Sequence, residues 1–364
     1  MKEFRYKSIF MQGSLQFCGN IVEYFVENTE KLVVFYVMPR TGNEQNLIRL
    51  YNKGKLVEEK VVKSSKNLIL CYICIYYNFV KILFSYFSRN EKFFVLAAHP
   101  LFLYFRSFLN LFRSYECVYS VDDYYPGYNP INVMYRIIAK YYHDRSRFRT
   151  YISDRLNKKM NGRIMQNKYI KTVMWGIKPP KTYKKQANRP ITLCFIGAIR
   201  ESHGIKLALD LLLKQKGLKI KILGTCPSHL FKKYQKLIKA YGISDRVYFP
   251  NKFTENLEQE VKDCHMGIAL YDIRSGSYYS DPGKVKTYAQ LGLPIVMTDV
   301  AEVAGYLIKF KAGVVVDERV ESVWKGIQRI YKSYLVYMQG LERFNQYFTY
   351  TTYYARVFRF LEHE

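Results

Sequence analysis

Short apolar strands alternate with amphipathic helices along most of this chain, and this alternation is the strongest constraint on its fold. In the second half an apolar strand at 191–197 runs into a glycine, a helix pattern follows at 205–214, and another strand covers 219–223. The series continues to a last strand at 313–316. Strands that are separated by single helices form parallel sheets with helices packed on the faces. We therefore predict an α/β fold.

The alternation is interrupted at residues 176–190, where proline and lysine accumulate and the apolar periodicity is lost. A chain of 364 residues is expected to form two domains rather than one. We predict a Rossmann-like domain over residues 1–175, a linker over 176–190 and a second Rossmann-like domain over 191–330. Residues 331–364, which are rich in Tyr and Phe, are predicted to form a helical tail.

The charge of the chain is strongly positive. It has 57 Lys and Arg against 30 Asp and Glu, a net charge of +27, which indicates an anionic partner such as nucleic acid, anionic lipid or a phosphorylated substrate. The basic residues are spread along the sequence without a nucleic-acid-binding signature, so we expect no nucleic acid partner. The seven cysteines are scattered in apolar runs, which indicates free thiols in a reduced, cytoplasmic protein, and we expect no signal peptide.

The most specific motif is the segment 281–298. It begins with a turn signal, and a two-turn helix is predicted to run from Lys284 until Gly292 ends it before a short buried strand. Lys284 is thereby placed at the start of a helix, whose free N–H groups and positive dipole end favour a phosphate. We predict that a nucleotide diphosphate docks on Lys284 and the backbone at Gly283. Lys286 is predicted to be a surface residue.

This segment resembles the sugar-nucleotide site of GT-B glycosyltransferases of the family 4-like, or group 1, superfamily, many of which carry Pro-x-Lys-x-x-Glu-Tyr-x-x-x-Gly-x-Pro. The chain matches the pattern at Pro282, Lys284, Tyr288, Gly292 and Pro294. It departs at Thr287, where the family has a glutamate that holds the donor ribose, although Thr287 still offers a hydroxyl. The alternative Glu-x7-Glu pattern would place its acids at Tyr279 and Thr287, so neither acid is present.

The resemblance implies two Rossmann-like domains that face a cleft, with a C-terminal helix that crosses back to the first domain. It also implies a sugar transferase that uses a nucleoside-diphosphate-sugar, UDP in preference to GDP, and that needs no metal. The first domain would bind the acceptor and the second the donor. A sugar-nucleotide 2-epimerase of the same fold and a non-catalytic nucleotide-sugar-binding protein are alternatives.

A glycine-containing loop follows the first strand of the second half and runs from Gly197 to Gly204. A strand that leads through such a loop into a helix is the usual place to hold a phosphate. The family often has Gly-Arg-x-x-x-x-Lys-Gly here, whereas this chain has Ala198 and His203 at the two basic positions. Arg200 offers a guanidinium from a shifted position. Arg200 and His203 either contact the donor or are ordinary loop residues.

Further candidates lie at the ends of other predicted strands. Gly13 and Ser14 follow the first strand, where a small residue lets a donor phosphate or sugar approach the backbone, or is an ordinary strand-to-loop glycine. His99, Asp123 and Asp272 lie at or near strand ends, so each is a candidate base toward an acceptor hydroxyl or a simple loop residue. A retaining mechanism would need no such base.

Residues 68–87 form a long apolar and aromatic run that is interrupted by Asn78 and Lys81 and flanked by basic residues. Three interpretations remain open, namely a buried core helix, an interfacial helix on anionic lipid and a membrane span. From the charge, the aromatic residues and the family habit, we predict a cytoplasmic protein that is peripheral at the inner face of the membrane. Its acceptor would be a hydroxyl of a lipid-linked saccharide in surface polysaccharide synthesis.

Overall fold

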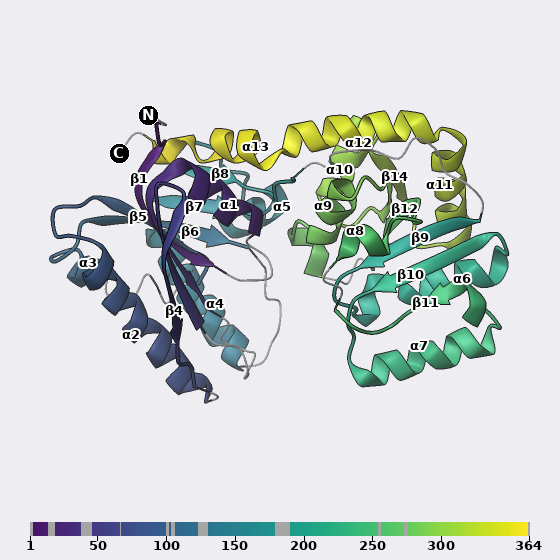
Figure 1. Cartoon of the computed structure of the whole chain (residues 1–364), viewed down its shortest axis with the longest axis horizontal. Coiled ribbons are helices and arrows are strands. Elements are labelled where there is room, and N and C mark those ends of the chain that lie inside the picture. The colour runs from purple at the N-terminus through teal and green to yellow at the C-terminus, as the bar shows by residue number, and fades with distance from the viewer. Residues whose placement is uncertain are drawn as a thin grey trace. The chain divides into compact units, whose positions relative to one another are not determined.

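The protein has an α/β architecture, which confirms the predicted fold class. The computed structural model describes residues 3–13, 19–37, 46–65, 67–99, 102, 106–122, 130–178, 190–253, 256–272 and 276–362. The chain divides into two compact units, Trp175–Thr352 and Met1–Met174 with Tyr353–Glu364. Each unit contains a sheet with helices packed against it (Figure 1).

The sheet of the first unit, among the described residues, has eight strands in the order β4-β3-β2-β1-β5-β6-β7-β8. Its strands are β1 (Tyr6–Gly13), β2 (Thr29–Tyr36), β3 (Asn46–Asn52), β4 (Lys55–Val62), β5 (Phe93–Ala97), β6 (Tyr115–Val121), β7 (Phe148–Tyr151) and β8 (Ile170–Thr172). The strands β3 and β4 pair antiparallel in a hairpin around Lys53 and Gly54, whose φ angles of 50° and 79° suit a tight turn. The other pairings, except that of β2 with β3, are parallel.

The helices of this unit include α1 (Gly19–Asn28), α2 (Leu68–Tyr86), α3 (Arg106–Leu109), α4 (Pro130–Arg145) and α5 (Asp154–Asn161). The side chain of Asn67 caps α2 by accepting hydrogen bonds from the N–H groups of Ile69 and Leu70. One face of α2 lies in the core through Cys71, Ile75, Phe79, Ile82 and Leu83. Residues 101–112 carry an apolar pattern typical of a helix, and among the described ones 106–109 form the single turn α3 before the chain continues from Leu109 into a non-helical turn.

The chain returns to the first unit near its C-terminus, as the resemblance implies. The helix α13 (Tyr350–Val357) is followed by a short 3₁₀ turn, η5 (Arg359–Leu361). The ring of Tyr354 packs on Tyr24 at a centroid distance of 5.6 Å, and the ring of Phe358 packs on Phe25 at 5.1 Å. These aromatic contacts hold the C-terminal residues on α1. Of the tail expected at 331–364, only the part from Tyr353 onward belongs to this unit.

The second unit contains a parallel sheet, with six described strands in the order β11-β10-β9-β12-β13-β14. They are β9 (Ile191–Ile196), β10 (Leu218–Leu223), β11 (Val247–Tyr248), β12 (Met266–Ala269), β13 (Ile295–Thr298) and β14 (Gly313–Val316). The helical elements are η2 (Glu201–His203), α6 (Ile205–Lys214), α7 (Ser228–Ala240), η3 (Ser244–Arg246), α8 (Leu257–Glu260), η4 (Gly276–Tyr279), α9 (Gly283–Gln290), α10 (Val303–Phe310), α11 (Val320–Lys332) and α12 (Tyr334–Phe348).

The strand order of this sheet reverses direction at β9. The chain moves from β9 outward through β10 to β11, and then returns to place β12 on the other side of β9. Ligands of parallel α/β sheets bind at the carboxyl ends of the strands at such a reversal. The loops that follow β9 and β12 are therefore the expected ligand-binding position in this unit.

Candidate functional site

The helix α9 is fixed against the carboxyl ends of β9 and β12 by one tyrosine. The hydroxyl of Tyr288 accepts a hydrogen bond from the N–H of Ile196 (3.0 Å) and donates one to the carbonyl of Ile268 (2.8 Å). The buried ring lies on Gly267, where any Cβ would overlap the ring atoms. Tyr288 thus ties the helix of the predicted phosphate motif to both strands at the reversal of the sheet.

Lys284, at the second position of α9, carries a buried ammonium group. Its Nζ lies 3.9 Å from the ring centroid of Phe195 and 4.9 Å from that of Tyr271. Within the described part of the chain this Nζ has no hydrogen-bond partner. Burial, assisted by the nearby charge of Arg200, lowers the pKa of Lys284 to about 7. An unpaired buried cation is costly, so the arrangement suits an anion that arrives from outside the protein.

The loop after β9 packs closely on the end of β12. Gly204 has a φ of 70°, and a Cβ at this position would collide with the carbonyl oxygen of Leu270. The N–H of Asp272 donates to the carbonyl of Ser202 (2.9 Å), which joins the loop to the segment after β12. Gly197, with a φ of 100°, begins the loop in a conformation that favours glycine. The two glycines therefore allow this loop to lie beside the rings of Phe195 and Tyr271, which contact the ammonium group of Lys284.

His203 lies in the same cluster but does not act as a second cation. Its Nδ1 donates to the carbonyl of Ala198 (2.9 Å), and its ring meets Tyr271 edge-on at a centroid distance of 5.3 Å. Burial, together with the charges of Lys284 and Arg200, lowers the pKa of His203 to about 4. The imidazole is consequently neutral at neutral pH. Arg200 influences both pKa values, which places its charge near the site.

Two other predicted positions belong to α9 itself. The hydroxyl of Thr287 is half-buried and donates to the carbonyl of Gly283 (3.1 Å), one turn earlier in the helix. Its oxygen lone pairs remain able to accept a hydrogen bond. Gly283 is exposed, and a Cβ there would meet nothing within 4 Å, so the backbone does not require glycine at this position.

In the first unit, several candidates share one edge of the sheet. The register of β1, β5 and β6 brings Gly13, His99 and Asp122 to the carboxyl ends of neighbouring strands. The side chain of Gln12 accepts hydrogen bonds from the N–H groups of Ala98 (3.1 Å) and His99 (2.9 Å). Burial raises the pKa of Asp122, which accepts a hydrogen bond from Ser120 at 2.6 Å. This edge carries polar groups, but it does not identify a base.

Four further predicted positions are Gly13, Ser14, Asp123 and Asp272. Gly13 faces the ring of Tyr36, which fills the space that a Cβ would need, so core packing alone accounts for this glycine. Ser14 and Asp123 lie outside the described residues. The carboxyl group of Asp272 follows β12 in the second unit and is half-buried. Their roles toward substrates stay predictions.

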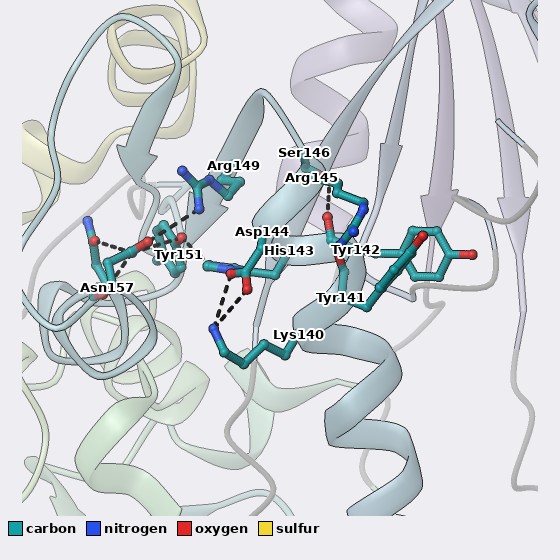
Figure 2. A network of polar contacts seen from close by, with 11 residues as sticks. Lys140, Tyr141, Tyr142, His143, Asp144, Arg145, Ser146, Arg149, Tyr151 and Asn157 are labelled. Atoms are coloured by element: carbon teal, nitrogen blue, oxygen red, sulfur yellow. Dashed lines mark hydrogen bonds and ion pairs between the residues drawn. The ribbon is translucent and has the colours of Figure 1, made fainter. Parts of the chain in front are cut away.

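A separate polar network in the first unit surrounds His143 (Figure 2). The buried ring contacts Asp144 through Nδ1 (2.8 Å) and the hydroxyl of Tyr151 through Nε2 (2.6 Å). The tyrosine oxygen in turn accepts a hydrogen bond from Asn161 (2.9 Å). In this network Nδ1–H donates to the carboxylate, and neutral Nε2 accepts from Tyr151. Burial lowers the pKa of His143, which agrees with a neutral histidine that joins α4 to β7 and α5.

Sequence reasoning missed the two rings that pack on Lys284, those of Phe195 and Tyr271, and it placed one lysine wrongly. The prediction that Lys286 is a surface residue is wrong, because its side chain is only 4% exposed and forms an ion pair with Asp281 at 3.1 Å. Helix geometry explains the error, since residues two apart project to nearly opposite sides. Phe195 and Tyr271 each stand near the end of an apolar strand pattern, which is the only signal in the sequence that points to them.

No metal centre is evident among the described residues, since they contain no group of three His, Cys, Asp or Glu side chains arranged to hold a metal ion. The same part of the chain contains one helix, α2, that is long and apolar enough to cross a membrane. Its window Ile69–Tyr86 has a mean hydropathy of 1.5, and 28% of that window is buried within the protein.

Comparison with known proteins gives structural matches but no sequence match. No protein-family model and no curated protein matches the chain. Sucrose-phosphate synthase from Thermosynechococcus elongatus is 11% identical with a TM-score of 0.70, and the alignment covers 96% of this chain and 97% of that chain. Anabaena HepE, solved with UDP and glucose, is 11% identical with a TM-score of 0.67 and coverages of 98% and 99%.

A third structural match is the lipopolysaccharide outer core galactosyltransferase WaaB. It is 15% identical with a TM-score of 0.64, and the alignment covers 97% of this chain and 99% of that chain. These matches extend over nearly the whole of each protein and include both sheets. The chain therefore has the GT-B glycosyltransferase fold.

Proposed function

We propose that the protein is a glycosyltransferase that takes its sugar from a UDP-sugar. The observation that carries this proposal is the buried ammonium of Lys284 at the start of α9, which has no hydrogen-bond partner among the described residues and has the charge of Arg200 nearby. A diphosphate would supply the missing partner and would offset charge that develops on the departing nucleotide. The N–H groups at the start of α9 add donors of the kind that phosphate accepts.

The structural matches support this choice of substrate class. HepE was solved with UDP and glucose, and WaaB is named for galactosyl transfer to the lipopolysaccharide outer core. By analogy, the second unit would hold the donor and the first unit would bind the acceptor, a hydroxyl of a lipid-linked saccharide. His99, Asp123 and Asp272 remain the candidate bases, and the transfer is proposed to need no metal.

A donor panel tests the proposal directly. The purified protein is incubated with UDP- and GDP-sugars, with and without extracted lipid-linked saccharide. Release of UDP that depends on the acceptor supports transfer. Conversion of the sugar without an acceptor would instead identify an epimerase, and saturable binding without turnover would identify a binding protein. Lys284→Ala should weaken UDP binding more than tenfold, or over ~1.4 kcal/mol, while Lys309→Ala on α10 should not.

We further propose that the protein binds the inner face of the membrane through the outer face of α2. That face exposes the apolar side chains of Ile69, Leu70, Ile73, Tyr77 and Phe84. The ring of Phe84 meets Phe112 at 6.2 Å, and Phe112 meets Phe108 at 5.4 Å, so the apolar surface continues past α3. The guanidinium of Arg113 lies 4.4 Å from the Phe84 ring centroid.

The charges around this surface complement anionic lipid. Between residues 60 and 90 the sequence has several Lys and Arg but no Asp or Glu. Aromatic and aliphatic side chains on one face, with basic residues beside them, are typical of helices that lie in a membrane interface. The opposite face of α2 is already used by the core, which favours an interfacial helix over a membrane span.

Liposome flotation tests this surface. Wild-type protein should float with vesicles that contain anionic lipid, less so at high salt, and Ile73→Ser/Tyr77→Ser should lose most of that binding. A matched control is Leu335→Ser/Val336→Ser, which removes two exposed apolar side chains from α12 in the second unit. Equal flotation of both double variants would contradict the proposal. A concentration-dependent dimer that Ile73→Ser/Tyr77→Ser dissolves would show that a second copy covers the face instead.

A further inference from the structure

We propose that Asp281 and Lys286 are positioning residues that couple anion binding at Lys284 to the backbone of residues 175–178. This inference rests on the proposed donor site, and it adds a segment of the same chain that responds when an anion occupies the site. The coupled segment begins where the chain leaves the first unit, since the division falls between Met174 and Trp175.

The two side chains hold both backbone groups of Trp175. The carboxylate Oδ2 of Asp281 accepts a hydrogen bond from the Trp175 N–H at 2.8 Å. The ammonium of Lys286 donates to the Trp175 carbonyl at 3.0 Å and to the same Oδ2 at 3.1 Å. Both side chains are buried, with exposed fractions of 0% for Asp281 and 4% for Lys286. A single buried ion pair therefore latches α9 to this backbone.

The backbone at Ile177 is also hydrogen-bonded to residues 348–350, which lie just before the chain returns from the second unit to the first. The N–H of Ile177 donates to the carbonyl of Phe348, and the N–H of Tyr350 donates to the carbonyl of Ile177, each at 2.8 Å. The Nζ of Lys286 lies 3.6 Å from the ring centroid of Phe348. Since the chain returns to the first unit after Thr352, the latch contacts both connecting segments within the second unit.

Helix geometry directs the two lysines of α9 to different sides of the helix. Lys284 and Lys286 are two residues apart, about 200° around the helix. Lys284 is directed at Phe195 and Tyr271, while Lys286 is directed at Trp175 and Phe348. The first turn of α9 is thus the common element between them. Any shift of that turn when an anion binds Lys284 is transmitted to the latched backbone.

The chemistry of the pair favours positioning over simple stabilisation. A buried ion pair contributes little net stability compared with apolar residues of the same shape, because both charges lose their hydration. Loss of hydration lowers the pKa of Lys286, and Asp281 opposes that effect. The remaining oxygen of Asp281, Oδ1, has no hydrogen-bond partner in the described part of the chain. What the pair provides is a fixed geometry for Trp175.

Hydrogen exchange of the full-length protein, with and without saturating UDP, tests the coupling. In the wild type, UDP should slow exchange of the amides of residues 175–178 and 348–352 by about fivefold or more, the lower end of typical coupling. In Asp281→Asn/Lys286→Met, which removes both charges together, the slowing should disappear even where UDP binding is saturated. Lys286→Arg in the wild-type background should keep it. The control Lys214→Met/Glu321→Gln removes an exposed pair of the same unit and should behave as the wild type.

The outcomes separate the coupling from the donor proposal. If UDP binds but wild-type exchange at these amides does not change, the coupling is refuted and the donor site stands. The same conclusion follows if the double variant, folded by circular dichroism, keeps the slowing. If UDP does not bind, inorganic pyrophosphate is the second probe. If pyrophosphate slows exchange at these amides, the coupling stands and the donor is not a UDP-sugar. If neither UDP nor pyrophosphate changes the exchange, both the coupling and the donor site are refuted.

Discussion

Binding of UDP should become weaker as the pH rises above 7, because Lys284 must be charged to hold the diphosphate. The pKa of this lysine falls from its ordinary 10.5 to about 7 in the ligand-free protein. That difference corresponds to about 5 kcal/mol in favour of the neutral amine. The faces of Phe195 and Tyr271 favour the cation by roughly 0.5–2 kcal/mol. Burial is therefore the larger effect.

The sign and size of the pH effect follow from proton linkage. A bound diphosphate keeps Lys284 charged, so the pKa of the lysine is higher in the complex than in the free protein. Binding then takes up one proton above pH ~7, and affinity falls about tenfold for each pH unit. Between pH ~7 and pH ~9 the dissociation constant should rise about fifty-fold. The terminal phosphate of UDP does not titrate in this window, since its pKa is near ~6.

Isothermal titration calorimetry in buffers of different ionisation enthalpy measures both the affinity and the protons taken up. Lys284→Arg is the matched variant, because a guanidinium stays charged throughout the window and should give a nearly flat profile. A flat wild-type profile, or a slope that Lys284→Arg retains, would refute the assignment of the anion site to Lys284. An affinity of the wild-type protein for UDP that increases with pH would also refute this assignment.

Three further predictions concern stability. Lys284→Met should raise the free energy of unfolding of the ligand-free protein at pH ~7 by roughly 1–4 kcal/mol, measured by urea denaturation, since it removes a buried unpaired amine; unchanged or lower stability would contradict this. Gly204→Ala should lower the free energy of unfolding by more than ~2 kcal/mol, because its Cβ would strike the Leu270 carbonyl; a small loss in the same titration would show that the loop can move aside. The lowered pKa of His143 means that stability is present above its ordinary value of 6.5 and is lost as the pH falls through the folded value, so melting temperatures between pH ~7 and pH ~5 should fall less steeply in His143→Gln than in the wild type.

Much of the fold could be predicted from the sequence because the local signals agree with one another. The strand that leads into Gly197 and the helix that starts at the predicted phosphate motif both appear where the patterns indicated. The described residues of the helix-like pattern at 101–112 form a longer helix nowhere beyond the turn at 106–109, since apolar residues alone cannot distinguish a helix from irregular chain that packs on a core. There the local pattern was compatible with more than one conformation.

The candidate site was only partly predictable, because its parts come from distant positions. Lys284 could be chosen from its own motif, but Phe195 belongs to the end of β9 and Tyr271 follows β12. Their contact with Lys284 depends on the strand order that places β12 next to β9. A sequence pattern carries no information on that order. The fate of Lys286 likewise depended on Trp175, more than one hundred residues away.

The distribution of charge on α9 explains how one short helix can serve an anion without neutralising itself. Asp281 is the nearest acid in the motif, and its carboxylate is occupied by Lys286 and by the Trp175 N–H. Had that carboxylate reached Lys284 instead, the pair would satisfy each other and a diphosphate would have to displace an internal partner. Across the helix, Lys286 is therefore bound to Asp281 and Trp175, whereas the ammonium of Lys284 has no hydrogen-bond partner in the described part of the chain, and Arg200 raises the local positive potential. The absence of acids at positions 279 and 287 acts in the same direction, since a carboxylate at either position would add negative charge to this part of the unit.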